Sequence, residues 1–134
     1  MDARGQLTLS IHLDTHVLLW ISQGRIRTLG EKAFRLAVGL PWIVSPVVSL
    51  ELEILHEIGR IKATPDRVMK AANEQGSLRF SDMPFAEVVE GAAKLSWTRD
   101  PIDRLVTAHA MADGAKLLTA DAKIRAHFKD AVWD

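Results

Sequence analysis

Four acidic residues at well-separated points of the sequence are of the type that binds hard divalent cations: Asp14, Glu51, Asp103 and Asp121. Carboxylates that meet in one crevice repel one another, so such a group requires a cation or raised pKa values. Oxygen ligands without cysteine or clustered histidine favour Mg²⁺ or Mn²⁺. Such an ion lowers the pKa of a bound water and offsets charge on a phosphodiester during in-line displacement. If the four converge, they indicate metal-dependent phosphodiester hydrolysis, although four carboxylates alone identify no enzyme.

The composition limits the classes of protein to which the chain can belong. Its 134 residues carry 17 Lys+Arg against 17 Asp+Glu and contain no cysteine. This length predicts one domain, and the absence of cysteine excludes a disulfide scaffold, thiolate zinc sites and a cysteine nucleophile. With a net charge of zero, the protein as a whole does not attract nucleic acid electrostatically. A phosphate-bearing partner must therefore bind through a local basic patch or through metal ions.

No membrane segment or secretory signal is expected from the sequence. The longest uncharged stretch, Ala37 to Leu50, is interrupted by Gly39, Pro41 and Pro46 and is too short to span a bilayer. The first residues have no apolar segment typical of a secretory signal. Together with the lack of cysteine, these features favour the cytoplasm.

The apolar pattern predicts strands that alternate with helices along the chain. Alternating residues from Leu7 to Leu13 predict a strand with Leu7, Leu9, Ile11 and Leu13 on one face, and further strands are predicted at 42–45, 78–81, 116–119 and 131–133. Helices are predicted over about 31–38, 46–59, 65–76, 84–97 and 101–114, with others starting at 14–15 and 121, and with a loop at 24–30. This order predicts an α/β domain with a mostly parallel sheet flanked by helices on both faces.

Two of the four acids are placed together by this fold alone. Asp14 follows the first strand, and Asp121 follows the strand at 116–119. Ligands of open α/β sheets bind outside the carboxyl ends of the strands. We therefore expect both carboxylates at the same edge of the sheet.

The helix after Pro46 places Glu51 in the middle of an apolar side, which carries Val47, Leu50, Ile54 and Ile58. A carboxylate facing the core is costly unless it is paired or bound to metal. Both a buried salt bridge to an arginine and a metal ligand remain open for Glu51. Glu53 and Glu57 point the other way and are expected to be solvated.

The segment from Thr98 to Arg104 has the chemistry of a helix start. Asp100 is expected to cap the helix, Pro101 takes its first position, and Asp103 favours the positive helix end. Asp103 also shares the inward face of this helix with Val106. Asp121 has a capping explanation of the same kind, so structural and catalytic roles stay open for these acids.

Four segments in order resemble a PIN-domain ribonuclease of the VapC-like toxin kind found in bacterial toxin–antitoxin pairs: IHLDTHVLLW, SPVVSLELEILHEIGRI, RDPIDRLVTAHA and KLLTADAKI. The resemblance runs from about 11 to 133 and implies a single PIN-like domain over 1–134. It also implies metal-dependent cleavage of RNA.

The resemblance carries over to individual residues of this chain. It implies catalytic and metal-binding roles for Asp14, Glu51, Asp103 and Asp121, with Mg²⁺ or Mn²⁺ as the cofactor. Asp100 matches an auxiliary acid of the same motif, and Thr119 matches a hydroxyl position that holds a water or a carboxylate. The acidic set is complete, so an active enzyme is expected.

The resemblance further implies a cognate antitoxin that blocks the acidic pocket, and a homodimer. The basic residues nearest the motifs are candidates for RNA contacts: Arg99, Arg104, Arg25 and Arg27. For each of them, a solvated arginine or a salt bridge is the favoured alternative. No glycine-rich phosphate-binding motif occurs, so no nucleotide cofactor is expected.

The five histidines are not expected to form a site, and no base-stacking role is expected for the tryptophans. His109 is expected to be a hydrogen-bonded core histidine, and the four tryptophans are expected in the core or at interfaces. Two other functions remain as alternatives to an RNase: a catalytically silent protein-binding module whose acids are structural, and a DNA-directed or structure-specific nuclease.

Overall fold

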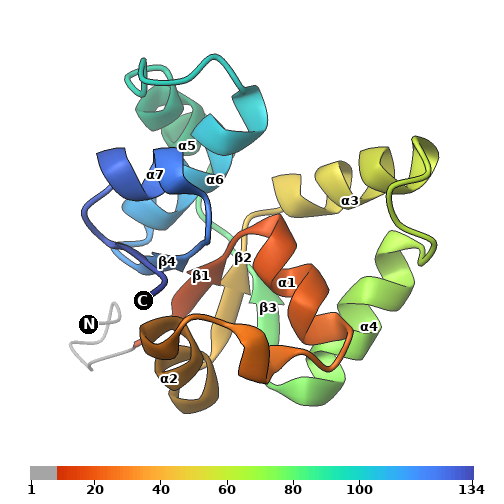
Figure 1. Ribbon diagram of the computed structural model, residues 1–134. Helices are drawn as coiled ribbons and strands as arrows, with labels where there is room; N and C mark the ends of the chain where they lie inside the picture. Colours follow the sequence, from red (N-terminus) through yellow and green to blue (C-terminus); the bar gives the residue numbers. More distant parts are fainter. Residues whose placement is uncertain (1–8) are drawn as a thin grey trace.

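The computed structural model of the chain describes residues 9–134, and within them the fold is a parallel sheet enclosed by helices (Figure 1). The strands are β1 (Ile11–Leu13), β2 (Trp42–Val44), β3 (Leu78–Phe80), β4 (Lys116–Leu118) and β5 (Ala131–Val132). Their order is β3-β2-β1-β4-β5, and every pairing is parallel. The predicted α/β class is confirmed.

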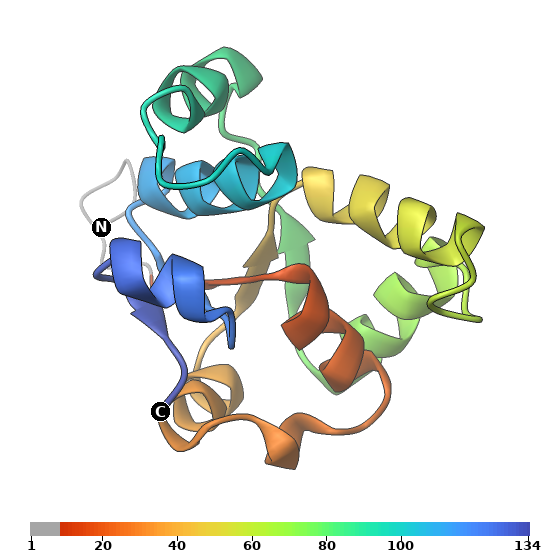
Figure 2. The ribbon, with the colours of Figure 1, turned by 45° about the horizontal axis from the view of Figure 1, so that its top comes forward.

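Seven α-helices are found in the described part of the chain. They are α1 (Thr15–Ser22), α2 (Glu31–Gly39), α3 (Val47–Glu57), α4 (Pro65–Gln75), α5 (Phe85–Ala92), α6 (Pro101–Ala112) and α7 (Ala122–His127). Helix α1 packs against α4 on one face of the sheet, whereas α5 and α6 pack together on the other (Figures 1 and 2). The strands up to β3 are added toward one edge of the sheet, and β4 and β5 are added toward the other edge. Because each crossover is right-handed, this change of edge places the later helices on the opposite face.

The first strand differs from its prediction. Residues 7 and 8 lie outside the described residues, Leu9 is 54% exposed, and β1 covers only Ile11–Leu13. Ile11, His12 and Leu13 are all buried, so the strand is not half-exposed as the alternation predicted. A central strand of a parallel sheet is covered on both faces, which removes any need for a polar side.

The apolar side of α3 also differs from the prediction. Leu50, Ile54 and Ile58 are 54%, 41% and 62% exposed, whereas Val48 and Leu52 are fully buried. The prediction that Leu50, Ile54 and Ile58 face the core is therefore wrong. Periodicity finds an apolar stripe on a helix, but it does not tell whether the stripe faces the protein's own core.

Two helix boundaries also differ from those predicted. Helix α5 ends at Ala92 rather than near Trp97, and the predicted loop at 24–30 contains a short 3-10 helix, η1 (Ile26–Thr28). Helix α3 ends close to Gly59 (φ +78°) and α6 ends close to Gly114 (φ +63°), as glycine after a helix predicts.

A buried polar network joins the sheet to α6. His12 Nε2 lies 2.6 Å from Asp113 Oδ2, and His109 Nδ1 lies 2.8 Å from Ser45 Oγ. His109 is 3% exposed, so its core placement is confirmed, but its Nε2 atom has no hydrogen-bond partner among residues 9–134. The two imidazole rings lie 5.6 Å apart.

The last strand is held against α2. The amide of Ala33 donates a hydrogen bond to the Trp133 carbonyl at 3.0 Å, just after β5 ends. A methyl group at Gly30 would overlap that same carbonyl. The glycine at the start of α2 therefore permits the close approach of the segment after β5.

Within residues 9–134, none of the helices combines the length and the apolar character needed to traverse a lipid bilayer.

Candidate active site

The four predicted acids line one cavity at the carboxyl edge of the sheet. The cavity has a volume of about 280 Å³ and is bordered by Asp14, Glu51, Asp103 and Asp121. Two of these follow the central strands directly, as expected, since Asp14 follows β1 and Asp121 comes shortly after β4. The Asp14 amide donates to the Leu118 carbonyl at 3.2 Å, which ties the ends of β1 and β4 together.

Asp14 is the most enclosed of the four carboxylates, with 9% of its surface exposed. It caps α1, where its Oδ1 atom accepts the Val17 amide at 2.9 Å. Burial raises the pKa of Asp14, while hydrogen bonds from Thr119 and Val17 and the charge of His16 oppose that rise, and the charge of Glu51 adds to it. The net direction of the pKa shift is upward.

Thr119 holds this carboxylate in place. Its buried hydroxyl accepts the Asp121 amide at 3.0 Å and hydrogen-bonds to the Asp14 side chain. A hydroxyl has one proton to donate and lone pairs to accept with, so both bonds can form together. Thr119 thus connects two acids of the cavity.

The surroundings of Asp103 indicate that the carboxylates are close enough to repel. Burial, followed by the charges of four neighbouring carboxylates, raises the pKa of Asp103 to about 6; these neighbours are Asp100, Asp121, Glu51 and Asp14. Like charges disfavour ionisation of a carboxyl group. The electrostatic crowding expected of a cation site is therefore present.

The capping roles predicted for Asp100 and Asp121 are also found. Asp100 Oδ1 accepts the amides of Ile102 and Asp103, and Asp121 Oδ1 accepts the amide of Ile124 at 2.9 Å. Asp100 is exposed and does not border the cavity, whereas Asp121 does. Because a carboxylate has two oxygens, capping leaves the second one available for a ligand.

Glu51 differs in exposure from Glu53 and Glu57 on the same helix, as the sequence predicted. Glu51 is half-buried and borders the cavity, whereas Glu53 and Glu57 are exposed. Within residues 9–134, no arginine or lysine forms an ion pair with Glu51. The buried salt bridge considered for this glutamate is not found there.

The donor chemistry of the cavity suits a hard divalent ion. Among the described residues, no group of three or more histidine, aspartate or glutamate side chains is arranged so that it could hold a metal ion by itself. Mg²⁺ typically keeps several waters and takes only one or two protein carboxylates, so an open cavity with four carboxylates fits such an ion.

Two of the arginines considered for RNA contacts, Arg99 and Arg104, donate hydrogen bonds to backbone carbonyls near α6. Arg104 is half-buried, and its Nε and Nη1 atoms donate to the carbonyls of Thr98 and Ala92 at 2.8 and 3.4 Å. Arg99 is exposed and donates to the Ser96 carbonyl at 2.8 Å. Neither side chain borders the acidic cavity.

The other two arginines lie around the short helix η1. Arg25 Nη1 lies 3.5 Å from the Gln23 side-chain oxygen, and the Arg27 guanidinium lies 5.9 Å from the centre of the Phe34 ring. Both are exposed, and both are absent from the walls of the acidic cavity. The structure thus does not bring any of the four arginines into the site, and RNA contact by them stays a prediction.

Two side chains of the cavity were not singled out as functional by the sequence. His16 and Trp20 both border it, with their rings 6.2 Å apart. The available signal is their spacing of four residues on α1, directly after Asp14, which puts them on one face of the helix. Trp42, in contrast, is 2% exposed and belongs to the core as expected.

Comparison with known proteins agrees with this geometry. The model of the PIN domain family matches residues 11–129. No curated protein in the comparison matches the chain significantly.

Solved structures of toxin–antitoxin complexes share the fold. A chain of VapBC2 from Rickettsia felis, solved with a promoter DNA fragment, is 17% identical with a TM-score of 0.63, covering 94% of this chain and 100% of that one. A toxin–antitoxin complex from Klebsiella pneumoniae gives 17% identity and a TM-score of 0.61, with coverage of 91% and 95%. A chain of VapBC-1 from nontypeable Haemophilus influenzae is 15% identical with a TM-score of 0.55, covering 94% of this chain and 97% of that one. With its acids at the carboxyl edge of a parallel sheet and the family model matched over most of its length, the chain belongs to the PIN-domain family.

Proposed function

We propose that this protein is a metal-dependent endoribonuclease of the VapC-like toxin kind, which hydrolyses RNA phosphodiester bonds in the cytoplasm. The observation that carries the proposal is the convergence of Asp14, Glu51, Asp103 and Asp121 on one cavity, with the pKa of Asp103 raised to about 6 by burial and by neighbouring carboxylates. Carboxylates that crowd in this way accommodate a cation readily.

The proposed cofactor is Mg²⁺ or Mn²⁺, held by the four acids. When bound, a divalent ion supplies positive charge toward a phosphodiester and acidifies a water molecule in its shell. The protein's own contribution is to fix the ligands: Thr119 and the Val17 amide orient Asp14, and the Ile124 amide fixes one oxygen of Asp121. Asp100 has an auxiliary role from outside the cavity: it caps the helix that carries Asp103, and its charge contributes to the raised pKa of Asp103.

The proposed protein partners are a cognate antitoxin and a second copy of the chain. The structures of similar fold are toxin–antitoxin complexes, which supports an antitoxin partner here. Exposed aliphatic residues lie on both sides of Glu51, where Leu50 and Ile54 on α3 and Ile58 at its end present an apolar surface. Apolar surface of this kind is typical of protein–protein contacts.

The decisive experiment is to sequence RNA ends after controlled expression of the wild type beside Asp14→Asn, with purified proteins assayed in parallel. We expect new RNA ends with the wild type only, and in vitro cleavage that stops with EDTA and returns with Mg²⁺ or Mn²⁺. A single-stranded DNA of the same sequence serves as competitor. Equal cleavage by both proteins would refute the site, and preferred cleavage of DNA would favour the DNA-directed alternative.

The silent binding module predicts a different result. If the acids are structural, neither protein cleaves RNA, and added Mn²⁺ does not shift the melting temperature. Both outcomes together would replace the nuclease proposal with the module.

A further inference from the structure

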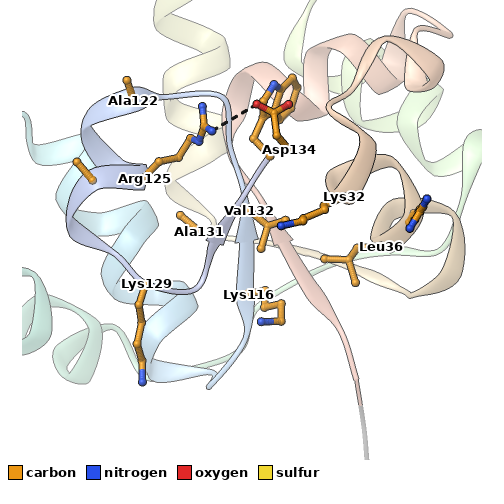
Figure 3. A pocket seen from close by; sticks show the side chains of 12 residues that line it. Lys32, Leu36, Lys116, Ala122, Arg125, Lys129, Ala131, Val132 and Asp134 are labelled. Atoms are coloured by element: carbon orange, nitrogen blue, oxygen red, sulfur yellow. Dashed lines mark ion pairs between the residues drawn. The ribbon is translucent and has the colours of Figure 1, made fainter.

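A second, larger cavity of about 810 Å³ has five basic side chains among the twelve residues that line it (Figure 3). Its cations come from four places in the fold: Lys32 and Arg35 on α2, Lys116 on β4, Arg125 on α7, and Lys129 after α7. The single acidic side chain among its lining residues is Asp134. In a chain with a net charge of zero, this is a marked local excess of positive charge.

These cations are only weakly held by the protein itself. Three of the five are in exposed ion pairs: Arg35 lies 2.6 Å from Glu31, Arg125 lies 3.6 Å from Asp134, and Lys116 lies 3.8 Å from Asp130. Within residues 9–134, Lys32 has no ion-pair partner, and Lys129 has none either. Exposed ion pairs contribute little to stability, so an incoming anion can replace them at small cost.

The basic cavity lies next to the acidic one, with α7 between them. Asp121 and Ile124 border the acidic cavity, whereas Ala122 and Arg125 border the basic one. Helix α7 has six residues. Because this one short helix contributes side chains to both cavities, the two cavities are close neighbours.

Two tryptophans join the cavities on a second route. Trp20 borders the acidic cavity and Trp133 borders the basic one. Their ring centres lie 5.6 Å apart with a tilt of 53°, and both side chains are half-buried. Partly exposed aromatic rings beside a basic groove are a typical platform for the bases of single-stranded nucleic acids.

We propose that the basic cavity binds the phosphate backbone of single-stranded RNA, which passes from the acidic cavity across Trp20 and Trp133. The inference rests on the proposed RNA cleavage and names the surface that holds the strand beside the cut. In the view of Figure 3, Arg125 lies near one end of the cavity, Lys116 and Lys129 near the other, and Lys32 between them, which suits an extended polyanion. RNA is favoured over an acidic protein segment because it has bases as well as phosphates. The bases can stack on the tryptophans between the two cavities, while the phosphates contact the cations.

The test compares two double variants that remove equal charge. Lys32→Ala/Lys129→Ala changes the cavity, and Lys70→Ala/Lys94→Ala changes exposed lysines that border neither cavity. Binding of a fluorescein-labelled single-stranded oligouridylate is measured by anisotropy in EDTA at several salt concentrations. We expect the first variant to bind about tenfold more weakly, with the slope of log K against log salt reduced by roughly 1.4, as loss of two phosphate contacts on a single strand predicts. The second variant should match the wild type.

Equal affinities of the two double variants would overturn the proposal. A labelled polyglutamate peptide is tested in parallel, and loss of its binding alone in Lys32→Ala/Lys129→Ala would assign the cavity to an acidic protein segment instead. Because binding is measured without divalent ions, failure of the nuclease proposal is distinguishable: RNA would still bind through the lysines, but no cleavage would follow when Mg²⁺ or Mn²⁺ is added.

Discussion

Glu51 and Glu53 lie on the same helix two residues apart, yet only Glu51 borders the acidic cavity. Glu51→Gln should therefore reduce RNA cleavage by about 100-fold or more, because metal sites are sensitive even to changes around their ligands. Glu53→Gln removes the same charge from an exposed position and should cleave at nearly the wild-type rate. Rates are compared on one RNA under single-turnover conditions. Similar activity of both variants would refute the role of Glu51.

Metal binding should stabilise the native protein. An ion present at about 100 times its dissociation constant adds about 2.7 kcal/mol to the free energy of unfolding, provided that it binds only the folded state. We expect Mn²⁺ to raise the melting temperature of the wild type, and we expect Asp14→Asn to show a much smaller shift. Calorimetry with and without EDTA measures both. An identical shift in the two proteins would place the ion elsewhere.

The raised pKa of Asp103 predicts that the ionised carboxylate destabilises the metal-free protein. The folded pKa of about 6 exceeds the ordinary value of 3.8, so ionisation of Asp103 costs stability as the pH rises through this interval. Asp103→Asn should thus raise the melting temperature in EDTA at pH 7.5 and have little effect at pH 4. Asp82→Asn, at an exposed position outside the cavity, is the matched control. A lower melting temperature of Asp103→Asn at pH 7.5 would assign Asp103 a structural role.

His109 should make the protein sensitive to mild acid. Burial and the charge of His12 lower the pKa of His109 below its usual 6.5. The unfolded chain therefore takes up this proton first, and stability falls as the pH drops below about 6.5.

A separate acid transition is expected at lower pH. Burial opposes ionisation of Asp113, but hydrogen bonds from His12 and Ser81 outweigh it and hold its pKa below 3.8. The stability that Asp113 contributes is lost only as the pH falls below 3.8. Urea unfolding from pH 7.5 to 3 should show both regions, and His109→Gln should flatten only the first. An unchanged slope between pH 7 and 5 would contradict the assignment.

Gly30 and Gly39 stand at the two ends of α2 and provide a matched pair for packing. A methyl group at Gly30 would overlap the Trp133 carbonyl, whereas one at Gly39 meets nothing within 4 Å. Gly30→Ala should lower the free energy of unfolding by about 1–3 kcal/mol, since a backbone segment must move. Gly39→Ala should be neutral or stabilising by up to about 1 kcal/mol. Chemical denaturation measures both, and equal effects would show that the Trp133 segment is not tightly packed.

The sequence could predict part of the acidic site because the fold places some of its residues by simple rules, whereas the full set of four acids came from the family resemblance. Asp14 and Asp121 follow strands whose carboxyl ends share one edge, and Asp100 caps a helix that carries Asp103 in its first turn. These are local patterns of strand end and helix start. They require no knowledge of how distant elements pack.

Other features depend on packing and could not be predicted in this way. The apolar stripe of α3 was assigned to the core, but Leu50 and Ile58 are exposed, because periodicity does not distinguish an inner face from an outer one. The basic cavity was missed for a related reason. Lys32 and Lys129 are far apart in the sequence and are brought together only by the docking of β5 on α2.

The place of β1 in the middle of the sheet also has a consequence for synthesis on the ribosome. Its neighbour on one side is β2, but on the other it pairs Ile11 with Lys116, which is translated much later. Until then, one edge of β1 has unsatisfied amide and carbonyl groups, which are a template for association with other chains. A prematurely terminated product lacking β4 should therefore aggregate rather than persist as a partly active fragment, so the proposed activity would depend on complete translation.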